Sequence, residues 1–227
     1  MSWRTIVQHA FGLDIPRTLE DACDPRRLAL IVYDMQVGIL RQITGGPEIT
    51  AKVVEVVRAA REARVRVFFT RHLSLPRELM GVFQLRMAMA WQRVDRAEDV
   101  QPWFLRDSPG FELVPEMTPR PSEAIFDKIT MSAFEGTPLN IALRDCGVTA
   151  FAIAGVATEI GIEPTVRHGA DLGFLPIVIR DACGAGHADA ADRSMASLEF
   201  LGDALFTHVG EFGALLRRGL LSTAPLA

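Results

Sequence analysis

Two charged residues, Asp34 and Lys128, stand where apolar segments of the chain end. Asp34 directly follows the apolar run over residues 28–33, and Lys128 ends a second run that begins at residue 124. In an open sheet of parallel strands, ligands bind at the carboxyl ends of the strands, so a polar residue at such an end has a raised chance of acting in a cleft. A third run leads through Gly155 into a predicted helix that carries Gly161. We therefore predict that Asp34 and Lys128 lie within salt-bridge reach of each other, at the same sheet edge as Gly161.

The elements that must position these residues follow from the pattern of apolar runs. Short continuous runs are typical of strands that are buried on both faces, and strands alternating with helices indicate a parallel sheet with right-handed crossovers. Thr137 as N-cap, Pro138 at the first helical position and Gly147 after the last turn frame one of the helices. The chain is predicted to be a single doubly wound α/β domain. The strands are expected at residues 28–33, 65–70, 124–127, 150–154, 176–179 and 204–206, and the helices at 49–63, 138–146 and 188–200.

The domain organisation is expected to have three parts. Residues 1–26 are predicted to form an N-terminal arm lying over the domain, and residues 27–220 the domain itself. A long insertion at about residues 72–120 carries a stretch rich in Met, Phe and Leu, for which two interpretations stay open. Its apolar side chains are either packing material in a helix core or subunit interface, or a lid that gives the cleft an apolar wall. They are Met80, Phe83, Met87, Met89 and Trp91.

The composition excludes several classes of protein. Hydrophobic residues make up 49% and charged residues 23%, which is the mixture of an ordinary globular domain. The net charge of −4 offers no general attraction for nucleic acid or anionic lipid, so neither is expected as a partner. The apolar runs are far shorter than the roughly 20 residues that cross a bilayer, and a cytoplasmic location is expected. The cysteines, three in number, show no C-x-x-C spacing, which disfavours disulfides and structural zinc.

Several short motifs resemble those of the isochorismatase-like hydrolase superfamily, in the family's order and from about residue 28 to residue 212. They are Asp34-Met35-Gln36, Phe69-Thr70-Arg71, Lys128 followed by residues 132–139, residues 154–158, and Asp181-Ala182. The resemblance implies a three-layer α/β/α sandwich around a six-stranded parallel sheet. It also implies a small-molecule substrate and a homo-oligomer, either a dimer or a tetramer.

The resemblance assigns catalytic positions to Asp34, Lys128 and Gly161. Most members of the superfamily use an Asp–Lys–Cys triad, and Gly161 stands where the cysteine would be. A thiol there would gain acidity from the helix N-terminus, whereas glycine has no nucleophile. The isochorismatases proper also carry Gly at this position and hydrolyse a vinyl ether, for which Asp34 would act as general acid. The ammonium of Lys128 opposes that role, because a nearby cation lowers the pKa of a carboxyl group, unless burial or an anionic substrate raises that pKa again. We expect the space opposite Gly161 to hold substrate or the attacking water.

Substrate contacts are expected from residues next to these positions. Arg71 and Arg86 are candidates for binding a substrate carboxylate, and His72 for a polar contact in the cleft. Glu159 or Glu163 is a candidate for positioning a water, although both can simply offset the helix dipole. No cofactor and no metal are expected, because no compact cluster occurs among the five histidines. The full set of expected substrate-binding residues is Gln36, Arg71, His72, Phe134, Val156, Ala157, Thr158 and Ile160.

Three functions stay open at this point. The first is a cysteine-independent hydrolase that acts on a vinyl ether. The second is an amide or ureide hydrolase in which activated water replaces the thiol. The third is a protein of this fold that has lost catalysis and serves as a binding or assembly module. The pairing of Asp34 with Lys128 argues against the third, because a buried ion pair without a function would carry only the cost of desolvation.

Overall fold

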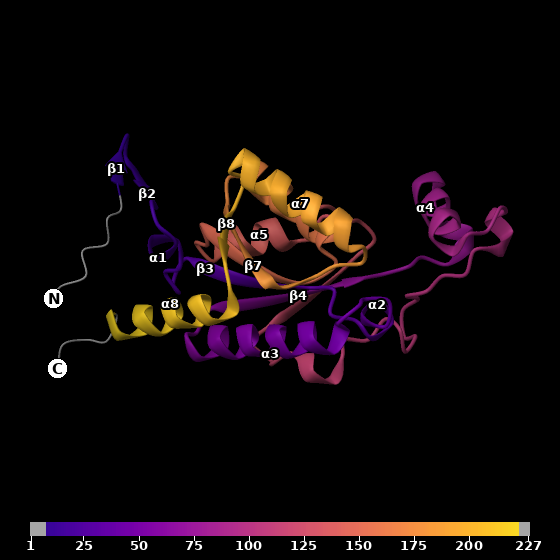
Figure 1. Cartoon of the computed structure of the whole chain (residues 1–227), viewed down its shortest axis with the longest axis horizontal. Coiled ribbons are helices and arrows are strands. Elements are labelled where there is room, and N and C mark those ends of the chain that lie inside the picture. Colours follow the sequence, from indigo (N-terminus) through magenta and orange to yellow (C-terminus); the bar gives the residue numbers. More distant parts are fainter. Residues whose placement is uncertain (1–7, 223–227) are drawn as a thin grey trace.

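The computed structural model describes residues 8–222, and a parallel sheet forms the centre of the molecule (Figure 1). Its six strands lie in the order β5-β4-β3-β6-β7-β8, and every neighbouring pair is parallel. The predicted fold class and all six predicted strands are confirmed. β7 is longer than predicted, because it continues past an irregularity in its pairing with β6 as far as Gly184. The strands are β3 (Leu28–Tyr33), β4 (Arg66–His72), β5 (Ala124–Lys128), β6 (Ala150–Val156), β7 (Leu175–Gly184) and β8 (Leu205–Thr207).

Helices cover both faces of this sheet and give it two separate cores. α3 (Gly46–Glu62) and α8 (Val209–Ser222) pack on one face, and α5 (Leu139–Asp145), α6 (Glu163–Asp171) and α7 (Ala188–Leu201) on the other. Every residue of β3 and of β6 is buried. Both strands therefore appear in the sequence as continuous apolar runs rather than as alternating patterns.

The N-terminal segment differs from its prediction. β1 (Gln8–Ala10) and β2 (Leu13–Ile15) form an antiparallel hairpin that stands away from the domain, with Phe11 at its exposed turn (Figure 1). An isolated hairpin of three-residue strands offers only a small face to pack, and its apolar side chains Phe11, Leu13 and Ile15 are exposed. Only the region around the short α1 (Leu19–Ala22) joins the core, and residues 1–7 of the predicted arm lie outside the described residues.

The insertion between β4 and β5 contains η1 (Arg77–Leu79), α4 (Val82–Gln92), η2 (Ala97–Asp99) and η3 (Pro115–Met117). α4 projects from the body of the molecule, carries no buried residue and exposes Val82, Phe83 and Trp91 (Figure 1). The apolar side chains of α4 therefore do not form a domain core. Among residues 8–222, no helix is long and apolar enough to cross a membrane.

Candidate active site

The carboxylate of Asp34 and the ammonium of Lys128 form a buried ion pair at the carboxyl edge of the sheet. Lys128 Nζ lies 2.7 Å from Asp34 Oδ2. The hydroxyl of Thr70 donates to Asp34 Oδ1 at 2.6 Å and accepts from the Asp34 backbone N–H at 3.2 Å. The predicted pairing of Asp34 with Lys128 is confirmed, and both carboxylate oxygens already accept a hydrogen bond.

The strand order explains why these residues meet. β3, β4 and β5 are neighbours, and the register places His72 opposite Lys128. Asp34 has φ of 48°, in the left-handed region that Asp tolerates better than most residues. The chain thus turns sharply at the end of β3 and holds the carboxylate at the sheet edge. On the other side of β3, an added Cβ at Gly155 would lie 2.1 Å from the carbonyl oxygen of Tyr33, so only glycine allows this approach of β6.

Lys128 lies behind Asp34 rather than in open space. Its side chain has no exposed surface, Nζ also donates to the carbonyl oxygen of Thr130 at 3.1 Å, and it lies 4.3 Å from the centre of the Tyr33 ring. Burial lowers the pKa of Lys128, and the carboxylate of Asp34 opposes that effect. Lys128 therefore contacts Asp34 from behind and does not line the cavity.

Tyr33 fills the space in which a cysteine at position 161 would stand. A Cβ added to Gly161 would lie 2.0 Å from the Tyr33 hydroxyl oxygen and 2.3 Å from Cζ. The expectation that substrate or water occupies this space is wrong, because the phenol ring occupies it. The hydroxyl donates to the carbonyl oxygen of Met131. Burial raises the pKa of Tyr33 well above its ordinary value, and the nearby carboxylate of Asp34 adds to the effect, so the phenol stays neutral.

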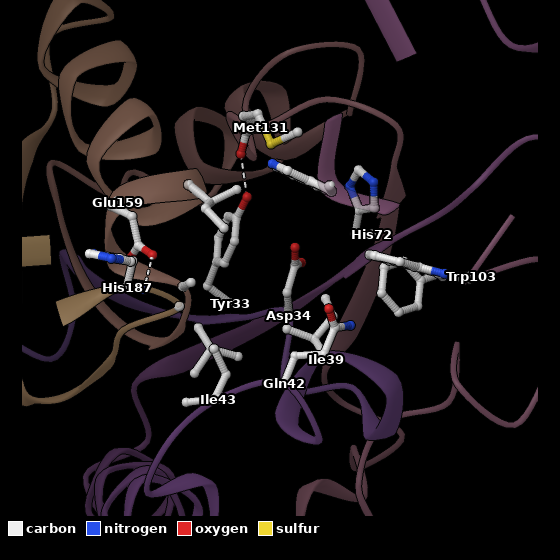
Figure 2. A pocket seen from close by; sticks show the side chains of 16 residues that line it. Tyr33, Asp34, Ile39, Gln42, Ile43, His72, Trp103, Met131, Glu159 and His187 are labelled. Atoms are coloured by element: carbon white, nitrogen blue, oxygen red, sulfur yellow. Dashed lines mark hydrogen bonds between the residues drawn. The ribbon is translucent and has the colours of Figure 1, made fainter. Parts of the chain in front are cut away.

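A cavity of about 450 Å³ opens beside this pair (Figure 2). It lies at the carboxyl ends of β3 and β6, where the strand order reverses, which is the usual ligand position in such sheets. Asp34 lies between Glu159 and His187 at one end and Trp103 and His72 at the other. The lining residues are Tyr33, Asp34, Ile39, Gln42, Ile43, His72, Trp91, Trp103, Phe104, Met131, Val156, Ala157, Glu159, Ile160, Gly186 and His187.

Four of the expected substrate-binding residues line this cavity: His72, Val156, Ala157 and Ile160. Val156 and Ala157 are joined by a cis peptide bond at the end of β6. Ile160 belongs to a single π-helical turn, η4 (Thr158–Ile162), which precedes α6. The ring of His72 packs edge-on against Phe104, with ring centres 6.0 Å apart.

The other four lie away from the cavity, and their side chains have structural partners. Gln36 is fully buried, donates to the carbonyl oxygens of His72 and Phe111, and accepts from the His72 N–H at 2.6 Å. Thr158 donates to the Gly184 carbonyl oxygen at 3.0 Å. Phe134 packs between Phe151 and Phe174 in the core.

Arg71 likewise does not line the cavity. Its guanidinium forms a bidentate ion pair with Asp127, with N–O distances of 2.8 and 3.2 Å, and lies 4.2 Å from the centre of the Phe111 ring. Arg86 is an exposed residue of α4 and does not line the cavity. A single sequence shows that an arginine follows a strand, but it does not show which carboxylate that arginine meets.

His72 is neutral at physiological pH. Burial lowers its pKa to about 4, and the nearby ammonium of Lys128 acts in the same direction. The wall next to Asp34 therefore carries no positive charge from this imidazole.

No prediction was made from the sequence for Tyr33, Thr70, Trp103 or Phe104. Thr70 lies within the Phe69-Thr70-Arg71 motif, and Tyr33 ends the apolar run over residues 28–33, but such a run gives no sign that the Tyr ring will face Gly161. Trp103 and Phe104 follow α4 in an irregular segment, and the fold of that segment brings them to the cavity. Clusters of aromatic residues in a long insertion were the available signal.

The cysteines have no place in the cavity lining. Burial raises the pKa of both Cys183 and Cys23 to about 12, which suppresses their thiolates. Cys146 is the C-cap of α5. In the described part of the chain, no group of three or more His, Cys, Asp or Glu side chains is arranged to hold a metal ion.

Comparison with known proteins agrees with this geometry. The family model described as the isochorismatase domain matches residues 28–210. The chain belongs to the isochorismatase family. Members of this family are hydrolases, and the chain is accordingly a hydrolase, with its reaction still to be assigned.

Relatives with different names match most of the chain. A ureidoacrylate amidohydrolase of Methylobacterium radiotolerans is 28% identical over 94% of this chain and 88% of its own length. An uncharacterized isochorismatase family protein of Escherichia coli O157:H7 is 31% identical over 74% of this chain and 85% of its own. The structure of a cysteine hydrolase from Pseudomonas syringae pv. phaseolicola superimposes with a TM-score of 0.73, at 24% identity, over 86% of this chain and 94% of its own. That likeness shows the shared fold.

Proposed function

We propose that this hydrolase cleaves a C–N bond of a small amide or ureide without a covalent intermediate, with Asp34 as the general base. The observation that carries the proposal is the position of Asp34. Its carboxylate lines the cavity and is paired with Lys128 behind it. Position 161 in η4, where the family's nucleophile would stand, is glycine and has no nucleophilic side chain.

The hydrogen bonds of Asp34 favour a base over an acid. One oxygen accepts from an ammonium and the other from a hydroxyl, the pattern that suits an ionised carboxylate. The Lys128 ammonium, 2.7 Å from Oδ2, attracts negative charge on this carboxylate directly. Protonating the carbon of a vinyl ether requires the acid form, whereas activating a water requires the base form.

In the proposed reaction, Asp34 takes a proton from a water while the water oxygen attacks the carbonyl carbon. The resulting tetrahedral intermediate then expels the nitrogen, which takes up the proton that Asp34 holds, and Asp34 returns to its ionised state. Lys128 and Thr70 are positioning residues that keep the carboxylate oriented. The N-cap of η4 is Ala157, which lines the cavity and has no side-chain cap. Backbone N–H groups at a helix start stabilise developing negative charge.

A relative also supports a C–N substrate. The ureidoacrylate amidohydrolase named above matches along nearly the whole chain, and its name indicates hydrolysis of a C–N bond in a ureide. Only this type of bond is proposed for the present chain, since the residues that bind the rest of a substrate differ from one cavity to another.

Ether hydrolysis of the isochorismatase type is the second candidate. Gly161 favours it, because the resemblance gives isochorismatases proper the same residue at the position of the nucleophile. This mechanism needs Asp34 in its acid form, against the pull of Lys128.

A substrate screen separates the candidates. Purified protein is incubated with amides, ureides and vinyl ethers, and the release of ammonia or amine is measured beside the release of the enol-derived ketone. Ammonia or amine release supports the proposal. Ketone release from a vinyl ether, or tight binding without any turnover, contradicts it.

The same proposal includes a homo-oligomer, either a dimer or a tetramer. The exposed apolar side chains on α4, among them Val82 and Phe83, support it, because an exposed apolar patch commonly marks a protein interface. Light scattering of the purified protein tests this part of the proposal separately.

A further inference from the structure

Glu159 places a carboxylate in the cavity wall without a compensating cation. Its Oε1 accepts from the backbone N–H of His187 at 2.6 Å (Figure 2). Its Oε2 is shielded from solvent and has no hydrogen-bond partner among the described residues. A carboxylate with one unsatisfied oxygen and no paired cation gives the cavity wall a negative potential, which favours a bound molecule that brings a hydrogen-bond donor or a positive charge.

The remaining charges around the cavity do not cancel this carboxylate. Asp34 is already neutralised by Lys128 at 2.7 Å, and that ammonium has no exposed surface. The pKa of His72, lowered by burial to about 4, leaves its imidazole neutral at physiological pH. Among residues 8–222, no lysine or arginine lines the cavity. The cavity is therefore poorly suited to a substrate carboxylate, and the sequence-based expectation of an arginine contact finds no support here.

Glycine at position 186 leaves room for the Glu159 carboxylate. A Cβ added to Gly186 would lie 2.7 Å from Glu159 Oε1, so any other residue at position 186 would displace the carboxylate. Both residues line the cavity, as does His187. Local backbone geometry thus keeps room for the carboxylate at this end.

The opposite end of the cavity is apolar and aromatic. Trp103 packs against Phe104 and lies near Trp91, and all three line the cavity. Asp34 lies between Trp103 and Glu159 (Figure 2). Aromatic walls bind flat or apolar groups and also attract cations. The reacting carbon of a substrate spanning the cavity would accordingly lie near Asp34.

We propose that the cavity selects substrates that carry a hydrogen-bond-donating nitrogen group, free of negative charge, on an apolar or aromatic body, and that Glu159 sets this preference. This inference rests on the proposed function, because it assumes that the cavity beside Asp34 is the substrate site. It names the substrate class that the proposed hydrolase accepts.

The test compares two probes that share an aromatic body and contain no bond for the enzyme to hydrolyse. Benzylammonium and phenylacetate are titrated into wild-type protein by isothermal calorimetry. Benzylammonium is expected to bind at least about tenfold more tightly, since a hydrogen bond to a charged group contributes that much or more. Glu159→Gln should reduce this preference to a few-fold, because the amide keeps the size of the side chain and removes its charge.

Two further variants sharpen the comparison. Glu163→Gln makes the same chemical change one helical turn away, where the carboxylate pairs with Arg167 outside the cavity, and should leave the preference unchanged. Gly186→Ala leaves Glu159 chemically intact but displaces it, and should weaken benzylammonium binding as well. Equal binding of the two probes, no binding of either at millimolar concentration, or a preference that survives Glu159→Gln would overturn the inference. Because neither probe is hydrolysed, failure of the proposed C–N chemistry would leave this selectivity in place.

Discussion

The contact between Tyr33 and Gly161 predicts that even a single methyl group at position 161 destabilises the protein. In Gly161→Ala the new Cβ would lie 2.0 Å from the phenol oxygen and 2.4 Å from Cε1, well inside van der Waals contact. The ring cannot swing aside freely, since it is buried and its hydroxyl donates to Met131. Overpacking of this kind costs about 1–3 kcal/mol, whereas the gain in helix propensity from Gly to Ala is at most about 1 kcal/mol.

The expected net loss is about 1–2 kcal/mol, which corresponds to a fall in melting temperature of about 2–8 °C for a chain of this size. Thermal unfolding followed by circular dichroism measures it. Gly210→Ala is the matched control, because an added Cβ there would contact nothing, and its stability should stay unchanged or rise slightly.

A double variant isolates the cause. Tyr33→Leu removes the ring, so adding Gly161→Ala in that background should cost much less than it costs alone, with a coupling energy of about 1–3 kcal/mol. If Gly161→Ala is as stable as wild-type protein, or costs as much with Leu at position 33, the ring does not fill the space of the missing thiol.

Two other predictions concern ionisation. Iodoacetamide at neutral pH should leave turnover intact, because burial raises the pKa of Cys183 and that of Cys23 to about 12. A loss of activity that substrate prevents would contradict the cysteine-independent mechanism if mass spectrometry maps the modification to Cys183. His72 has a folded-state pKa of about 4 against an ordinary 6.5, so the unfolded chain binds more protons and the unfolding free energy should fall by about 3 kcal/mol as pH drops from 6.5 to 4. His72→Gln should remove that part of the pH dependence in urea titrations, whereas an unchanged slope would show that His72 is not responsible.

The sequence predicts the sheet well because each strand of the sheet centre is buried on both faces. The runs that became β3 and β6 are apolar throughout, and the breakers between them fix the helices. The pairing of Asp34 with Lys128 was likewise predictable, because strand ends gather at one edge of a parallel sheet.

Other features depend on tertiary contacts that no local pattern encodes. The direction of the Tyr33 ring, the pairing of Arg71 with Asp127 and the burial of Gln36 are set by which segments meet after folding. The position of the N-terminal hairpin is likewise not encoded locally, since Leu13 and Ile15 alternate on one face of β2 and yet stay exposed. The residues that line the cavity were therefore predicted less well than the ion pair.

The rate of the Asp34→Asn variant is the most direct test of Asp34 as the general base. Asn preserves the size of the side chain and tolerates the left-handed backbone at this position, but it cannot accept a proton from water. It also leaves Lys128 buried without its carboxylate, which is expected to cost about 3–5 kcal/mol of stability, so rates are compared only at temperatures where each variant is folded. Asp127→Asn on β5 is the matched control, because that carboxylate pairs with Arg71 and lies outside the cavity.

The measurement is kcat/KM on the amide or ureide that the screen identifies. We predict that Asp34→Asn loses about 10²–10⁴-fold while Asp127→Asn stays within a few-fold of wild-type protein. If Asp34→Asn retains more than about a tenth of the wild-type kcat/KM, a change in barrier of only about 1.4 kcal/mol, Asp34 is not the general base.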